Sequence, residues 1–190
     1  MRKSDAETVE TRKRIIELAA REFQRKGISA TRVDDVMEAA GLTRGGFYRH
    51  FESKEDLFSQ SFDLAMSRYT DLIREKGKSS DGGIDAIAAY YLSTSHRDDP
   101  ASGCPIAALG GELRHFDQNF RARFSKGFED FVSALAEQLG EHGDERRRVA
   151  LSAFSMMLGA ITLSRFVGDE AISEEILEAC KIHMRSGLAV

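Results

Sequence analysis

The chain has 190 residues, a formal net charge of −4 and only two cysteines, Cys104 and Cys180. That length can bury a sizeable core in one or two domains, and two cysteines argue against a disulfide scaffold or a zinc site. No apolar run approaches the ~20 residues of a membrane span, and the first residues lack the apolar stretch of a signal peptide. We therefore expect a cytoplasmic protein without a membrane partner.

The charge is unevenly distributed along the chain. Residues 1–54 hold 12 Lys and Arg against 9 Asp and Glu, a balance of +3, and residues 55–190 hold 15 against 22, a balance of −7. A basic head on an acidic body is typical of a protein that touches DNA at one end only. The acidic body argues against a DNA-compacting protein, which would need a basic surface throughout.

The first predicted helix begins between Ser4 and Thr11 and ends before Gly27, because glycine readily adopts the backbone conformation that closes a helix. Basic side chains cluster near its start. They either contact DNA phosphates or form a solvated helix end, and both alternatives stay open. These side chains are Arg2, Lys3, Arg12, Lys13 and Arg14.

A short helix is predicted on each side of Gly41. Thr31-Arg32-Val33-Asp34 is a variant capping box with aspartate in place of the usual glutamate, so a helix should begin there and run through Ala40. Gly41 favours the tight turn that ends such a helix. Two short helices joined by a turn make a helix-turn-helix.

Residues 42–51 are predicted to form a helix that enters the major groove of DNA. Phe47 and Phe51, four residues apart, would anchor it on one side. Gly45 and Gly46 each cost a helix about 1 kcal/mol relative to alanine, so one reason to keep them is the close approach of bare backbone to a phosphate or base edge. The alternative is a solvated, glycine-rich turn. Thr43 would cap this helix, and Arg44, Tyr48, Arg49 and His50 would face outward.

The next predicted helix begins at Lys54, with Ser53 as its cap. A lysine in a first turn meets the positive end of the helix dipole, which is unfavourable. A DNA phosphate beside Lys54 would resolve this conflict.

Three runs of residues in the first third of the chain resemble the TetR family of transcriptional regulators. They are Arg12-(x)2-Ile15-Ile16-(x)2-Ala19-Ala20-(x)2-Phe23-(x)3-Gly27-(x)3-Thr31, then Val36-(x)2-Ala39-Ala40-Gly41, then Gly45-(x)2-Tyr48-(x)2-Phe51-(x)2-Lys54-(x)2-Leu57-Phe58. This pattern is far more specific than a lone helix-turn-helix.

The resemblance implies an all-α homodimer with a DNA-binding domain in residues 1–53 and a ligand-binding and dimerisation domain in residues 54–190. The helix pattern of the whole chain adds up to about nine helices. The expected partners are double-stranded operator DNA, a second copy of the chain and a small-molecule effector. A repressor is expected from the resemblance alone, on a near-palindromic operator.

The family's roles carry over to matching positions. Thr31, Arg32, Tyr48, His50 and Lys54 fall on the phosphate side, and Thr43 and Arg44 in the groove. Gly46 stands where many members place a side chain that touches a base, so base reading should rest more heavily on Arg44. The expected DNA-contacting set is Thr31, Arg32, Thr43, Arg44, Gly45, Gly46, Tyr48, Arg49, His50 and Lys54.

Six helices are predicted after residue 53. They cover residues 54–76, 84–96, 104–113, a segment starting at 117 or 119, 144–167, and a segment capped at Ser173 that runs to about 187. Residues 149–166 are apolar on nearly every face, so that helix must be covered on both sides, and a second copy of the chain is the simplest cover. The expected dimer contacts are Phe154, Met157, Ile161, Ile176 and Cys180.

The identity of the effector does not follow from the residues. Apolar and aromatic side chains of the body offer plausible pocket walls. The candidates are Tyr69, Tyr90, Tyr91, Cys104, Phe116, Met156 and Met157.

Cys104 could have a catalytic, a sensing or a structural role. With His96 and His115 it could form a thiol-catalysis set, but no third orienting group is evident, and we expect neither an enzyme nor a cofactor or metal. Cys104 also opens a predicted helix, where a thiolate is stabilised. The Gly103-Cys104-Pro105 segment resembles that of a NemR-like group in which a cysteine senses electrophiles or oxidants. The competing interpretation is a small buried hydrophobe.

Overall fold

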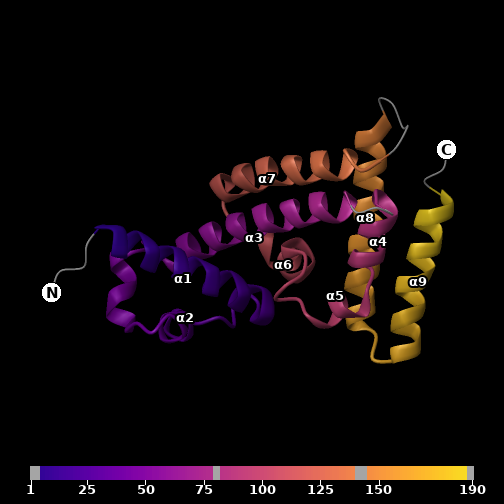
Figure 1. Ribbon diagram of the computed structural model, residues 1–190. Helices are drawn as coiled ribbons and strands as arrows, with labels where there is room; N and C mark the ends of the chain where they lie inside the picture. Colours follow the sequence, from indigo (N-terminus) through magenta and orange to yellow (C-terminus); the bar gives the residue numbers. More distant parts are fainter. Residues whose placement is uncertain (1–4, 79–81, 140–144, 188–190) are drawn as a thin grey trace.

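In the computed structural model, residues 5–78, 82–139 and 145–187 are described, and they form nine α-helices and one 3-10 helix without a strand among them (Figure 1). The expected all-helical fold is confirmed. Arg2 and Lys3 lie outside the described residues. The elements are α1 (Asp5–Lys26), α2 (Val33–Ala39), η1 (Arg44–Arg49), α3 (Lys54–Gly77), α4 (Ile84–Tyr91), α5 (Thr94–Asp98), α6 (Pro105–Leu113), α7 (Gln118–Ala136), α8 (Arg146–Phe166) and α9 (Glu170–Gly187).

The helices divide between two ends of the molecule. We call α1, α2 and η1 the head and α4 to α9 the body; Figure 1 shows the head at one end, α8 and α9 at the other, and α3 and α7 side by side between them. Phe58 of α3 contacts Phe23 of α1 with ring centroids 5.2 Å apart and Phe116 of the body at 4.7 Å. The apolar core is therefore continuous from head to body through α3.

The predicted starts of three helices are confirmed by residues typical of a first turn or an N-cap. Ser53 Oγ accepts from Asp56 N at 3.1 Å at the start of α3, and Asp117 Oδ1 accepts from Phe120 N at 2.8 Å at the start of α7. Pro105 occupies the first turn of α6, where its missing N–H costs nothing.

Two predicted helices have different boundaries. The helix expected over residues 84–96 is split in two, because Ser93 Oγ accepts from His96 N at 3.2 Å and so caps a separate α5. The last helix begins before Ser173, with Asp169 Oδ1 accepting from Ile172 N at 3.1 Å. Ser173 instead lies inside α9 and donates to the Ser164 carbonyl at 2.7 Å.

The capping box expected at Thr31 is wrong. Arg32 occupies the cap position of α2, and no side chain caps that helix. Thr31 is buried, and its hydroxyl donates to the carbonyls of Gly27 at 2.7 Å and Glu22 at 3.2 Å. The threonine therefore closes the end of α1 rather than the start of α2.

Arg165 of α8 joins three elements of the body. Its guanidinium donates to the carbonyls of His96 at 2.8 Å, Arg97 at 3.0 Å and Ala107 at 3.1 Å. These carbonyls belong to α5 and α6, so a single planar side chain holds both helices against α8.

Helix α8 is long and apolar enough to cross a membrane by length and composition, so the expectation that no stretch reaches this size is wrong. Its side chains Ala153, Phe154, Met157 and Ile161 are buried in the core of the molecule. This core position accounts for much of its apolar composition.

Candidate nucleic-acid interface

The segment expected to enter DNA forms a 3-10 helix rather than an α-helix. η1 begins after Thr43, and its bonds run from Gly46 N to Thr43 O at 3.0 Å and from His50 N to Phe47 O at 2.9 Å. Thr43 occupies the cap position in an extended conformation, but its hydroxyl makes no cap hydrogen bond, so that expectation is wrong. Phe47 and Phe51 are both buried with stacked rings 5.6 Å apart, as expected of anchors.

Gly45 and Gly46 are not required by the fold itself. A Cβ atom at Gly45 would meet nothing within 4 Å, and one at Gly46 would lie at an ordinary 3.6 Å from Met37 Cε. Neither residue has a positive φ. Because the chain's own packing leaves room for side chains at both positions, their absence favours the close approach of another molecule.

Five of the expected DNA-contacting side chains are exposed on η1 and on the residues that precede α2 and η1, and we call this set the reading face. The side chain of Arg44 is 73% exposed, and that of Arg32 is equally so. His50 is half-buried, and its carbonyl accepts from Arg12 Nε. The exposed members of the reading face are Arg32, Thr43, Arg44, Tyr48 and Arg49.

Two basic side chains of α1 have hydrogen-bond partners within the chain. Arg14 Nη2 donates to the Ala40 carbonyl at 2.6 Å, which closes the C-terminal end of α2. Arg12 donates to the His50 carbonyl at 3.3 Å, and its guanidinium lies 5.0 Å from the centre of the Phe51 ring. Both arginines hold the ends of helix-turn-helix elements in place.

A carboxylate lies between two arginines of the reading face. Asp34 Oδ2 is 3.2 Å from Arg44 Nη1 and 3.6 Å from Arg32 Nη2. The expected role of Asp34 was a helix cap, so this bridge was missed. Its sequence signal is weak, because Asp34 and Arg44 are ten positions apart.

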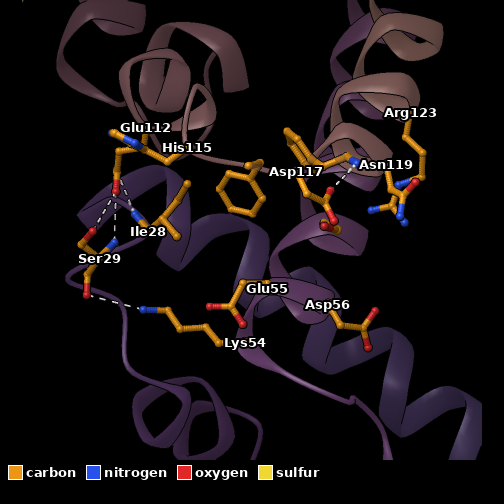
Figure 2. Close-up of a pocket in the computed structure, with 13 residues that line it drawn as sticks. Ile28, Ser29, Lys54, Glu55, Asp56, Glu112, His115, Asp117, Asn119 and Arg123 are labelled. Carbon is orange, nitrogen blue, oxygen red and sulfur yellow. Dashed lines mark hydrogen bonds between the residues drawn. The ribbon is translucent and has the colours of Figure 1, made fainter.

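Lys54 lies beside a cavity at the junction of head and body (Figure 2). Its Nζ is 3.5 Å from the Ser29 carbonyl. The cavity has a volume of about 490 Å³ and an aromatic wall formed by Phe116 and Phe120.

Across this junction, Glu112 at the end of α6 binds the loop between α1 and α2 (Figure 2). Its carboxylate accepts from Ile28 N at 3.0 Å, Ser29 N at 3.1 Å and Ser29 Oγ at 3.2 Å. Gly27, with φ of +85°, leaves room for this carboxylate, since a Cβ there would lie 2.8 Å from Glu112 Oε1. Glu112 therefore couples the body directly to the head.

The structure does not gather the expected ligand-contacting residues around one cavity. Phe116 lines the junction cavity, and Tyr69 lines a smaller one of about 200 Å³ between α1 and α3. Tyr91, Cys104 and Met157 are buried in the core, whereas Tyr90 and Met156 are partly buried against it.

Cys104 lies fully buried beside His96 and Tyr91. Its backbone N–H donates to His96 Nε2 at 2.9 Å, so Nε2 carries no proton and Nδ1 donates to the Tyr91 carbonyl at 2.6 Å. Burial raises the pKa of the Cys104 thiol, although the Tyr91 hydroxyl and the N–H groups of Ala107 and Ile106 lower it in part. His96 therefore faces backbone rather than activating the thiol, and His115 lies apart, at the junction cavity.

No group of three His, Cys, Asp or Glu side chains that could hold a metal ion occurs within residues 5–78, 82–139 and 145–187.

The expected dimer contacts lie mostly inside the single chain. Phe154, Met157 and Ile161 are buried against the chain's own core, and Cys180 is nearly so. Ile176 is partly exposed. The large apolar side chains that α8 and α9 leave exposed are Leu163, Phe166, Ile172 and Ile182.

Two family models match the chain. One, described as bacterial regulatory proteins of the tetR family, matches residues 15–60. The other, described as the C-terminal domain of LmrA/YxaF-like transcriptional regulators, matches residues 82–181.

Curated relatives include two named transcriptional regulators. AcrR of Shigella flexneri is 42% identical over 71 residues, which are 37% of this chain and 33% of AcrR. The chain thus spans about a third of that relative's length. The uncharacterized regulator YxaF of Bacillus subtilis is 25% identical over 162 residues, with 82% of this chain and 85% of YxaF covered.

Solved structures show the same fold. Reduced NemR of Escherichia coli has a TM-score of 0.75 at 22% identity, with 93% of this chain and 96% of NemR covered. A TetR-family regulator of Cytophaga hutchinsonii has a TM-score of 0.74 at 22% identity, with 97% of this chain and 98% of the other covered.

Proposed function

The chain belongs to the TetR family of transcriptional regulators, and we propose that it acts as a homodimeric repressor whose operator binding is released by a small-molecule effector. We place DNA binding in residues 1–53 and effector binding and dimerisation in residues 54–190, with α3 in contact with both parts. Such a regulator works on DNA in the cytoplasm, and its proposed role includes no enzymatic step.

The observation that carries the DNA-binding proposal is the reading face. An exposed guanidinium at Arg44, an exposed phenol at Tyr48 and two glycines that the fold does not need lie on one anchored helix. Guanidinium groups bind the edge of guanine through two hydrogen bonds. In a symmetric dimer, two copies of η1 would contact two half-sites of a near-palindromic operator.

Arg44→Ala and Lys54→Ala are expected to weaken DNA binding in different ways. Arg44→Ala should lose about 1–3 kcal/mol of discrimination at the base pair that it contacts. Lys54→Ala should weaken binding to all sequences alike and reduce the slope of log affinity against log salt by about 1. Both variants are compared by mobility shift on a duplex selected from random sequence. Unchanged selectivity of Arg44→Ala would contradict this account of base reading.

The hydrogen bonds that Glu112 accepts from Ile28 and Ser29, which we call the Glu112 bridge, support the proposed release by an effector. A ligand that moved α6 would pull directly on Ile28 and Ser29, next to Lys54. Two sites are coupled when binding at one of them changes the affinity at the other.

Glu112→Ala is expected to loosen the head without unfolding the body. It removes the acceptor of three hydrogen bonds, which should cost about 1–2 kcal/mol because Ser29 can bind water instead. Faster amide exchange at Ile28 and Ser29, together with weaker operator binding, is the expected result. The exposed Glu175→Ala on α9 is the control. Unchanged exchange in Glu112→Ala would show that the bridge does not order this loop.

Thiol sensing is disfavoured by the burial of Cys104 and its raised pKa, so we expect Cys104 to be unreactive in the folded protein. In a Cys180→Ser background, a thiol-reactive dye should label Cys104 far more slowly than after unfolding in urea. Release from the operator by quinones should be the same in Cys104→Ser as in the unmodified protein. Rapid labelling, with release that depends on Cys104, would instead support a sensor.

A further inference from the structure

Asp34 is an acidic side chain beside two arginines of the reading face. It is the second residue of α2 and lies within reach of two exposed arginines of the reading face, Arg32 and Arg44. A carboxylate at such a surface repels phosphates and weakens DNA binding in general. The helix dipole favours a carboxylate in this first turn of α2, and a further advantage would come from what Asp34 contacts.

The contacts of Asp34 suggest that advantage. Its Oδ2 is 3.2 Å from Arg44 Nη1 and 3.6 Å from Arg32 Nη2, so one oxygen ties a side chain of η1 to the start of α2. A guanidinium has five N–H donors in a rigid plane, and a single bond to Asp34 leaves the others free for a base edge.

Arg44 would otherwise be a long, mobile side chain. Its 73% exposure gives it little packing to hold it, and ordering such a side chain on binding opposes association. The bond to Asp34 restricts the guanidinium before DNA arrives.

We propose that Asp34 is a positioning residue for base recognition: without touching DNA, it holds Arg44 in the orientation that reads the operator and fixes its distance from Arg32. This inference rests on the proposed DNA-binding function. It assigns sequence specificity to a side chain that lowers general affinity.

The neighbouring residue provides a matched control. Asp35 carries the same charge in the same helical turn, but its Oδ2 lies 3.6 Å from Lys26 Nζ. Removing either acid therefore removes one negative charge near DNA, whereas only Asp34 contacts Arg44.

The test uses the full-length protein and a duplex that the unmodified protein selects from random sequence. Dissociation constants are measured for that duplex, for versions with each base pair replaced, and for an unrelated duplex. Asp34→Ala and Asp35→Ala should both bind the unrelated duplex more tightly. Only Asp34→Ala should lose discrimination, by about tenfold, at the base pairs where Arg44→Ala loses it. In the Arg44→Ala background, Asp34→Ala should cause no further loss.

Three results would overturn this inference but leave the proposed function standing. They are full discrimination in Asp34→Ala, an equal loss of discrimination in Asp35→Ala, and the same loss on Asp34→Ala substitution when Arg44 is already absent. A protein that selects no duplex would overturn the proposed function and this inference with it. Asp34→Leu, which is similar in shape but cannot accept a hydrogen bond from Arg44, replaces Asp34→Ala in every comparison if the alanine variant does not fold.

Discussion

Phe166→Asp is expected to convert the proposed dimer into monomers and to weaken operator binding by about a hundredfold to ten-thousandfold, because a monomer engages one half-site without the gain from the second. Phe166 is 78% exposed at the last turn of α8, so the described residues cover little of its ring. Leu163 lies three positions earlier on the same side of the helix.

Helix α9 exposes further apolar side chains. Ile172 and Ile182 are exposed on α9, which packs along α8 (Figure 1). Exposed apolar patches of this kind mark contacts between proteins, and an unpaired carboxylate buried in one would oppose association.

Light scattering measures the oligomeric state, and a mobility shift measures operator binding. Val9→Asp is the control for the oligomeric state, since Val9 is also apolar and exposed but lies on α1. It should leave the dimer intact. A Phe166→Asp protein that remained dimeric would place the interface elsewhere.

Lowering the pH from 7 to about 4 should cost the folded protein roughly 3 kcal/mol through His96 alone, since burial lowers the pKa of this side chain from 6.5 to about 4. His96 is a buried residue of α5, and its Nε2 accepts the Cys104 N–H. Protonation would replace that acceptor with a second donor and leave a charge beside Arg165.

The direction follows from comparing the folded and unfolded chains. Below pH 6.5 the unfolded chain takes up a proton on His96 that the folded chain does not, so the contribution of His96 is complete above pH 6.5 and declines toward pH 4. Below that, both states are protonated and the loss grows no further.

Urea unfolding at about pH 7, 6 and 5 measures this dependence. His96→Gln should be less stable at pH 7 but should show a shallower decline, because glutamine does not titrate. The exposed His115→Gln is the control for general effects of removing a histidine. An identical decline in His96→Gln and the unmodified protein would assign the acid sensitivity to other groups.

The fold and the exposure of the reading face were predictable because they depend on local patterns. These patterns involve residues that are only a few positions apart. They include helical periodicity, the Ser53 cap and Pro105 in a first turn. The buried anchors Phe47 and Phe51 followed from their spacing alone.

The contacts that were missed join distant parts of the chain. Glu112 binds Ile28 and Ser29, more than eighty positions away, and nothing in the local pattern of α6 indicates this. The sequence also did not determine which face of α8 packs against the chain's own core, because this helix is apolar on nearly every side. Phe154 and Met157 were therefore expected at the dimer contact, although they lie inside the single chain.

The Glu112 bridge bears on the construction of hybrid repressors. A head transplanted from this chain onto another regulator would leave behind the carboxylate that accepts from Ile28 and Ser29, and Gly27 would open onto an empty space. A recipient with an acidic side chain at the equivalent end of its sixth helix should accept this head with its operator preference intact. A recipient without one should need that single residue supplied along with the head.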